Sequence, residues 1–184
     1  MKRAVSRISA IFLTFLVVIW AAMMALNAQT DKPDAPAFNV TSLDGKQFDS
    51  ASLRGKIVVV DFWFTGCPPC LEELPKLNSL VDEFKNKDII FIAPTWDKEP
   101  TLRTFLKEYP FKYQIIPNAK ALVLEACRDG EGNVEVPTHM VINRDGKVEL
   151  KSVGGFTTEE GKKDYDNLRE TLVRLLNAPP DKSK

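Results

Sequence analysis

The chain has 184 residues, 25 acidic and 25 basic side chains, and a hydrophobic content of 44%. This length and composition are typical of one globular domain with extensions. The balanced charge argues against a nucleic-acid partner, which would call for clustered basic residues. Three cysteines are too few for a disulfide-stapled scaffold. A single histidine argues against most metal sites, so the sequence predicts no metal and no other cofactor.

The N-terminus is a basic cluster followed by an apolar run. Lys2, Arg3 and Arg7 precede a stretch without charge from Ile8 to Leu26. A cleaved signal has an apolar region of about 7–15 residues and a spanning helix one of about 17–25. The run therefore favours a membrane anchor over a signal cleaved after Ala28. In both cases the basic residues stay in the cytoplasm and the rest is exported, either anchored at the periplasmic face of a bacterial inner membrane or released as a periplasmic or secreted protein.

The first elements after residues 1–28 are a linker, a hairpin and a buried strand. Residues 29–36 contain two prolines and few large apolar groups, which indicates a linker. The Asp44-Gly45 pair between two alternating segments predicts a β-hairpin over 38–48. The nearly continuous apolar run 57–64 predicts a strand that is buried on both faces.

Helical stripes alternate with strands in the remainder of the chain. Strands are predicted at 89–93 and, as a hairpin around Asp145-Gly146, at 138–142 and 147–150. Apolar residues at three- and four-residue steps predict three helices. Their stripes are Leu74, Leu77, Val81 and Phe84; Leu102, Phe105, Leu106 and Tyr109; and Tyr165, Leu168, Leu172 and Leu175. A further short helix is predicted around 119–126. The order hairpin, βαβα, hairpin, α predicts a three-layer α/β domain over 37–177, with a mixed central sheet, helices on both faces and a tail over 178–184.

The segment Cys67-Pro68-Pro69-Cys70 lies where the buried strand ends and the first long helix begins. A helix N-terminus carries free N–H groups and a partial positive charge, which stabilises a thiolate at Cys67 and makes it nucleophilic near neutral pH. Cys70, one turn deeper, would resolve the mixed disulfide that Cys67 forms with a substrate. The two prolines fix φ and lack N–H groups, so they stiffen the loop.

Two other interpretations of the cysteine pair stay open. A spacing of two residues between cysteines also occurs in zinc sites. Such a site would need a second pair of ligands, for which Cys127 and His139 are a poor substitute. A purely structural disulfide is the other alternative, although a bridge across so small a loop removes little entropy from the unfolded chain.

The sequence from Val60 to Cys70, VDFWFTGCPPC, resembles the active-site segment of thioredoxin. Together with LEELP over 71–75 it is similar to the membrane-anchored TlpA/ResA branch of the thioredoxin superfamily. The resemblance extends over about 35–177. It implies a thioredoxin-like fold with an N-terminal hairpin extension and a thiol–disulfide oxidoreductase.

The resemblance implies roles for three residues outside the cysteine motif. Asp61 matches a buried acid that exchanges a proton with Cys70; a desolvated carboxyl group accepts a proton readily and can act as a base near neutrality. An aspartate at a strand edge, facing water, is the ordinary alternative. Pro137 matches the cis-proline that faces the cysteines. Val136 would then offer its backbone to an extended substrate strand.

Further positions follow from the same resemblance. Pro68, Pro69 and Trp63 are expected at the substrate-binding region, with Trp63 packed under the site or simply filling the core. Glu73 matches an acidic modulator beside the site, and a solvated charge on the helix face is an equal alternative. Pro75 matches a kink in the active-site helix.

The chain departs from the family pattern at one position and has two residues without a family role. Gly66 stands where thioredoxin has a tryptophan before the first cysteine, so an exposed aromatic side chain is missing there. Cys127 is expected to be a buried free thiol. His139 follows Pro137 on a strand and is expected to be a structural histidine.

These features predict an extracytoplasmic enzyme that reduces disulfides in exported proteins through attack by Cys67 and resolution by Cys70. A membrane partner would supply the electrons, and the resemblance links such enzymes to cytochrome c maturation. The alternative is a copper chaperone on a thioredoxin-like fold, because thiolates suit Cu(I), but such chaperones space their cysteines by three residues. A peroxiredoxin-type peroxidase is disfavoured because Phe64 occupies the position three residues before Cys67.

Overall fold

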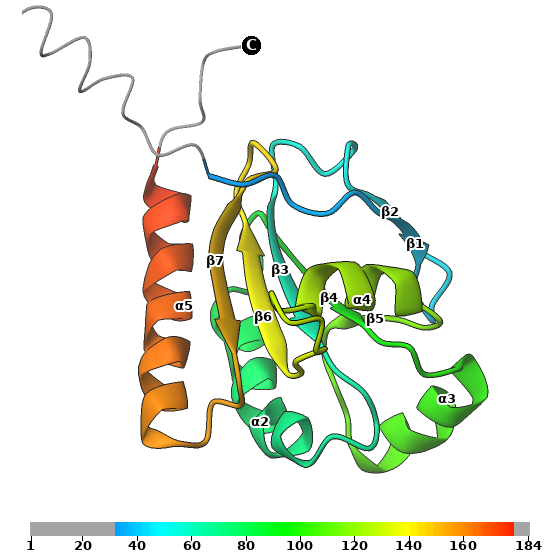
Figure 1. Cartoon of the computed structure of the whole chain (residues 1–184). Helices are drawn as coiled ribbons and strands as arrows, with labels where there is room; N and C mark the ends of the chain where they lie inside the picture. The colour runs from blue at the N-terminus through cyan, green and yellow to red at the C-terminus, as the bar shows by residue number, and fades with distance from the viewer. Residues whose placement is uncertain (1–31, 179–184) are drawn as a thin grey trace, which may run out of the picture. The chain divides into compact units, whose positions relative to one another are not determined.

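The computed structural model describes residues 32–178 (Figure 1). The predicted anchor, residues 29–31 of the predicted linker and the tail from 179 onward lie outside the described residues. Within 32–178, no helix combines the length and the apolar character that crossing a membrane requires.

The described residues form a five-stranded mixed sheet in the order β5-β4-β3-β6-β7. Its strands are β3 Ile57–Phe62, β4 Ile89–Pro94, β5 Gln114–Ile116, β6 Thr138–Ile142 and β7 Val148–Val153. Strands β3, β4 and β5 are parallel, whereas β6 is antiparallel to β3 and β7 is antiparallel to β6. This arrangement confirms the predicted mixed sheet. The sequence analysis missed β5, which is only three residues long.

Helices cover both faces of the sheet, which gives the three predicted layers (Figure 1). The helices are α2 Pro68–Glu83, α3 Glu99–Glu108, α4 Lys120–Cys127 and α5 Glu159–Asn177. Side chains alternate along β3, so Ile57 and Val59 pack with α2, α3 and α5, whereas Val58 and Val60 pack with α4. By the same alternation Asp61 faces the layer that contains α2 and α5.

A small hairpin and the segment before it complete the domain. Strands β1 Asn39–Thr41 and β2 Gln47–Asp49 pair antiparallel, as predicted, and Phe48 packs into the α4 side of the core. Residues 33–35 are not a free linker. The Val148 N–H donates to the Pro33 carbonyl at 2.9 Å and the Ala35 N–H to the Gly146 carbonyl at 3.0 Å. Residues 33–35 are therefore paired with the β6–β7 turn.

Candidate active site

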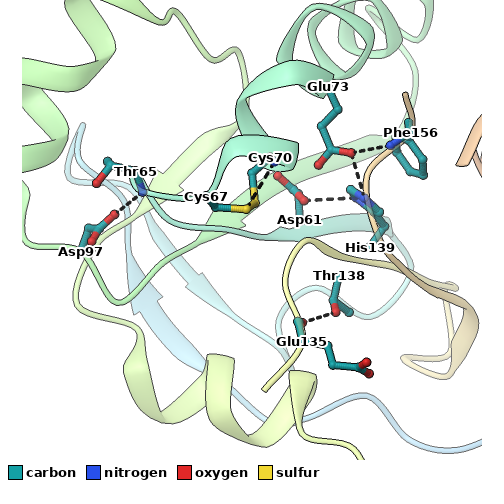
Figure 2. Close-up of a disulfide and its surroundings, with 10 residues drawn as sticks. All are labelled: Asp61, Thr65, Cys67, Cys70, Glu73, Asp97, Glu135, Thr138, His139 and Phe156. Carbon is teal, nitrogen blue, oxygen red and sulfur yellow. Dashed lines mark hydrogen bonds and ion pairs between the residues drawn. A yellow bond between two sulfur atoms is a disulfide. The ribbon is translucent and has the colours of Figure 1, made fainter. Parts of the chain in front are cut away.

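The loop between β3 and α2 carries the cysteine pair (Figure 2). Cys67 and Cys70 are joined by a disulfide and are 3% and 1% exposed. Cys67 is the N-cap of α2, and its sulfur accepts a hydrogen bond from the Cys70 N–H at 3.3 Å. Because Pro68 and Pro69 lack N–H groups, this is the first amide that the helix can direct at the sulfur. The same amide would stabilise a Cys67 thiolate.

Aromatic side chains lie beside this loop. The ring of Phe64 packs on Trp96, which follows β4, with centroids 4.9 Å apart, and both residues are half-buried. A Cβ atom at Gly66 would lie 3.1 Å from Phe64 Cε2, so the glycine leaves room for this ring. The Thr65 N–H donates to Asp97 Oδ2 at 2.6 Å and fixes the loop to the β4–α3 connection. The chain thus places a partly exposed aromatic pair near the position where thioredoxin has its tryptophan, which the sequence analysis missed.

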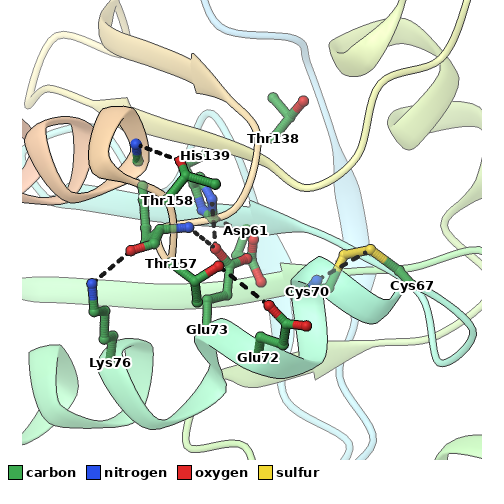
Figure 3. Close-up of polar contacts among 12 residues, drawn as sticks. Asp61, Cys67, Cys70, Glu72, Glu73, Lys76, Thr138, His139, Thr157 and Thr158 are labelled. Carbon is green, nitrogen blue, oxygen red and sulfur yellow. Dashed lines mark hydrogen bonds and ion pairs between the residues drawn. A yellow bond between two sulfur atoms is a disulfide. The ribbon is translucent and has the colours of Figure 1, made fainter.

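The β7–α5 connection packs on the first turns of α2 from another side. A Cβ atom at Gly155 would lie 3.2 Å from the Pro69 carbonyl oxygen, which is a tight contact, so glycine allows the two segments to approach without a shift. The Lys76 ammonium donates to the Phe156 carbonyl at 2.6 Å, and the Thr157 hydroxyl contacts Glu72 Oε2 at 3.3 Å (Figure 3). Pro69 itself remains exposed at the molecular surface, as does Pro68.

The bond between Val136 and Pro137 is cis, as the resemblance implied. Strand β6 begins at the next residue, Thr138, which pairs with Phe62 at the end of β3 that leads to the cysteines. Pro137 is buried and its carbonyl accepts from the Gly154 N–H at 2.9 Å. Val136 is half-buried, and neither its N–H nor its carbonyl has a hydrogen-bond partner within 32–178. A free backbone at this position can pair with an extended peptide.

Trp63, expected at the substrate-binding region, is a buried core residue. Its side chain is fully buried, and its ring packs against Phe105 and Phe111 with centroid distances of 5.5 Å. The indole N–H donates to the Ala93 carbonyl at 3.4 Å. The buried ring therefore fits both interpretations of Trp63 given above, packing under the site and filling the core.

Asp61, His139 and Glu73 form a buried polar cluster on the α2 side of the sheet (Figures 2 and 3). The β3–β6 register places Asp61 directly opposite His139. His139 Nδ1 lies 3.1 Å from Asp61 Oδ1, and Nε2 lies 3.3 Å from Glu73 Oε2. All three side chains are at most 1% exposed. Glu73 is therefore not a solvated helix-face charge, and Asp61 does not point into water.

The backbone and one aromatic ring complete this cluster. The Phe156 N–H donates to Glu73 Oε2 at 3.0 Å, and the Phe156 ring stacks on the imidazole of His139 at a centroid distance of 3.9 Å. Both close-ups show the Asp61 carboxyl group between the cysteine pair and His139. The expected structural histidine is therefore buried as predicted, but its partners are two acids next to the disulfide.

The environment of His139 holds it in the protonated form. Burial alone lowers its pKa, but the facing carboxylates of Asp61 and Glu73 outweigh this effect and raise the pKa of His139 to about 10. Burial raises the pKa of Glu73, and His139 opposes that rise. Burial also raises the pKa of the Tyr113 hydroxyl, to which the charges of both acids contribute.

The cluster contains residue types that bind divalent metals, and its candidate ligand atoms lie within 4.8 Å of one another. However, the two ring nitrogens of His139 face different carboxylates. An ion shared by all three residues would need one of these contacts to open. The arrangement as it stands is a cation between two anions.

Cys127, the last residue of α4, lies on the opposite face of the sheet. It is 1% exposed and has no disulfide partner, which confirms the expected buried free thiol. Burial raises the pKa of its thiol to about 11. A thiol with this pKa is protonated and unreactive near neutral pH.

Comparison with known proteins identifies the family. Residues 32–151 match the AhpC/TSA family. The chain belongs to this family. Within it, the chain is 34% identical over 128 residues to a thiol-disulfide oxidoreductase ResA of Bacillus cereus, and the match covers 69% of the chain and 72% of the relative. For ResA of Bacillus subtilis (strain 168) the identity is 32% over 136 residues, or 73% of each chain.

A solved structure agrees with this assignment to the AhpC/TSA family. A putative thiol:disulfide interchange protein DsbE from Chlorobium tepidum superimposes with a TM-score of 0.65 and 26% identity, covering 79% of this chain and 97% of that one. The fold is therefore thioredoxin-like, and this AhpC/TSA-family chain is a thiol–disulfide oxidoreductase of the ResA/DsbE type. The resemblance to the TlpA/ResA branch is confirmed.

Proposed function

We propose that the chain reduces disulfides in exported proteins, with cysteine pairs of cytochrome c precursors as one substrate class. The observation that carries this proposal is the position of Cys67 as the N-cap of α2, with the Cys70 N–H directed at its sulfur. A cysteine in this position has the thiolate character that attack on a disulfide requires. Cys70 follows one turn later and is bonded to it, so it is placed to resolve the intermediate.

The reaction has two exchange steps. The Cys67 thiolate attacks one sulfur of the substrate disulfide, and the other substrate sulfur leaves and takes up a proton from solvent. Cys70 then gives its proton to Asp61 and attacks Cys67 Sγ, which releases the second substrate sulfur as a thiolate that takes up a proton from solvent. Two electrons pass from the enzyme dithiol to the substrate. A membrane electron donor must then reduce the Cys67–Cys70 disulfide again.

The substrate would bind as an extended strand beside the cis-proline. The unpaired N–H and carbonyl of Val136 support this binding mode, because they can form main-chain hydrogen bonds with a peptide. Pro137 precedes β6, at the end of the sheet that carries the cysteine loop. The exposed Pro68 and Pro69 and the Phe64–Trp96 pair extend this surface.

The apolar run 8–26 supports action outside the cytoplasm from a membrane anchor, because its length suits a spanning helix. A tethered domain would remain near membrane assembly machinery and near its electron donor. The copper-chaperone alternative is less well supported, because both ring nitrogens of His139 face carboxylates and are not offered to the cysteine pair.

The reduction potential of the Cys67–Cys70 pair tests this proposal. The purified full-length chain carrying Cys127→Ala would be equilibrated in thiol–disulfide buffers, with tryptophan fluorescence as the readout. We expect a value near that of thioredoxin, about −270 mV, as suits a reductant. A value near about −120 mV would instead indicate a disulfide donor. Cys70→Ser is the control and should show no transition; a parent chain that behaved like this control would overturn the oxidoreductase chemistry.

A further inference from the structure

The buried acid of the proposed mechanism, Asp61, does not stand alone. A carboxylate oxygen of Glu73 and a ring nitrogen of His139 lie within 4.8 Å of it and of one another. The two acids come from different elements, β3 and α2, and the histidine from β6 lies between them. Two carboxylates this close in an apolar interior cannot both be ionised without a compensating cation. His139 is the only basic side chain among the three.

The other groups near this cluster carry no compensating charge. The β7 residue paired with His139 is Ser152, and the Phe156 ring covers one face of the imidazole. The buried Tyr113 hydroxyl has no hydrogen-bond partner within 32–178, and Tyr165 on α5 packs on the far side of Phe156 with its hydroxyl directed at the Lys76 carbonyl. The Lys76 ammonium itself binds the Phe156 carbonyl. The charge of the two acids is therefore balanced by the imidazole.

We propose that His139 is a positioning residue for the resolving step. Its cationic ring, held between Asp61 and Glu73, makes Asp61 available as the carboxylate that receives the Cys70 proton. This inference rests on the proposed function, since it concerns the second exchange step of that reaction.

The proton balance of the step is simple. Before resolution the cluster holds one imidazolium and two carboxylates, and Cys70 holds its thiol proton. When Cys70 attacks Cys67 Sγ, the S–S bond to the substrate breaks, the new Cys67–Cys70 bond forms, and the Cys70 proton moves to Asp61. The cluster then holds one imidazolium, one carboxylate and one carboxylic acid. No further oxidant or reductant is needed, because the substrate sulfur leaves with the electron pair.

Replacing the histidine by a neutral side chain changes this balance. In His139→Gln the two carboxylates share the pocket without a cation, so one of them retains a proton to a higher pH. The resolving step should therefore need a higher pH. In Glu73→Gln the opposite holds, because Asp61 keeps the imidazolium and loses its like-charged neighbour. The double variant lacks both the histidine and the glutamate. The pH that its resolving step needs should therefore lie between those of the two single variants.

The experiment separates the two exchange steps in the full-length chain carrying Cys127→Ala. The reduced protein is mixed with a dithiobis(nitrobenzoate) disulfide in a stopped-flow instrument. Attack by Cys67 releases one coloured thiolate, and resolution by Cys70 releases a second one. We expect the pH midpoint of the second phase to rise by roughly 1–3 pH units in His139→Gln. It should fall in Glu73→Gln and take an intermediate value in the double variant.

Met140→Leu is the matched control, because Met140 is the next residue on β6 but packs on the other face of the sheet. Its second phase should keep the midpoint of the parent. A His139→Gln midpoint equal to that of the parent would overturn the inference, as would shifts of His139→Gln and Glu73→Gln in the same direction, which a merely structural role would produce. A parent chain without any second phase would overturn the proposed function, and the inference with it.

Discussion

Two cysteine sites are buried in the same domain, on opposite faces of one sheet, and they occupy opposite helix ends. Cys67 and Cys70 lie at the N-terminus of α2, whereas Cys127 is the last residue of α4. All three are at most 3% exposed. The first site has an amide directed at its sulfur and a cluster of ionisable groups beside it. Around Cys127, burial raises the thiol pKa to about 11.

The difference shows that neither residue type nor depth decides which cysteine reacts. A helix N-terminus favours the thiolate and a helix C-terminus disfavours it. At the α2 site the carboxyl group of Asp61 lies between the cysteine pair and His139 (Figure 2). Substitutions at each of these points test the difference between the two cysteine sites.

The largest expected effect is the loss of disulfide reduction in Cys67→Ser, because a serine hydroxyl is not a nucleophile near neutral pH without a base of its own. The rate of insulin reduction should fall to that of the uncatalysed reaction. Cys127→Ala is the matched variant and should change the rate by less than about twofold, since its thiol is buried and protonated. A comparable loss in Cys127→Ala would remove the distinction between the two sites.

A smaller loss is expected in Asp61→Asn, which keeps the shape of the side chain but cannot accept a proton. General-base assistance contributes about 10²- to 10⁴-fold, so the release of substrate from the mixed disulfide should slow by a factor in this range near neutral pH. The first exchange step should be much less affected. Rapid-quench trapping of the mixed disulfide measures both steps, and equal slowing of the two would argue against a role in resolution.

The stability of the oxidised domain should fall as the pH rises above about 6.5. The pKa of His139 is raised from 6.5 to about 10, so the folded state keeps a proton that the unfolded state releases. The stabilisation is complete below the lower value and is lost as the pH approaches the higher one. Between about pH 6.5 and 8.5 this amounts to about 2 kcal/mol of unfolding free energy. Urea unfolding of the Cys127→Ala protein measures it, and His139→Gln should show a smaller decrease over the same interval.

The smallest effect concerns the close approach of the β7–α5 connection to the active-site loop. In Gly155→Ala the new Cβ would lie 3.2 Å from the Pro69 carbonyl oxygen, so the loop must shift slightly. We expect a loss of about 1 kcal/mol in stability and slower disulfide reduction. Gly130→Ala is the control, because a Cβ there meets no atom within 4 Å. Equal effects of the two substitutions would show that the contact with Pro69 is unimportant.

Local patterns predicted most of the fold. Periodicity and turn residues can be recognised within short stretches of sequence. They were sufficient to predict the apolar run of β3, the helical stripes and the two hairpins. Strand β5 was missed because three residues are too few to show a period. The pairing of residues 33–35 with the β6–β7 turn was missed because two prolines resemble a linker locally, whereas the pairing partners lie more than a hundred residues away.

The parts of the site that are contiguous in the sequence were predicted, whereas contacts between residues that are distant in the sequence were not. The cysteine motif and the cis-proline were recognisable from short segments. Glu73 was expected either as an acidic modulator beside the site or as a solvated charge, and His139 as a structural histidine. Their contact could not be predicted, because it depends on the register between β3 and β6 and on the face that α2 presents. Trp63 and Phe64 were adjacent aromatic residues in the sequence, and only the packing shows that one is core and the other lies beside Trp96.

The pairing of residues 33–35 with the β6–β7 turn also keeps this segment away from the reactive end of the domain. The turn lies at one end of β6, and the cis-proline and the disulfide lie at the other. Five strand residues separate these ends by about 16 Å. A peptide that binds beside Val136 would therefore contact the end of the sheet opposite residues 33–35, and substitutions in this segment would leave the surface that the peptide contacts unchanged.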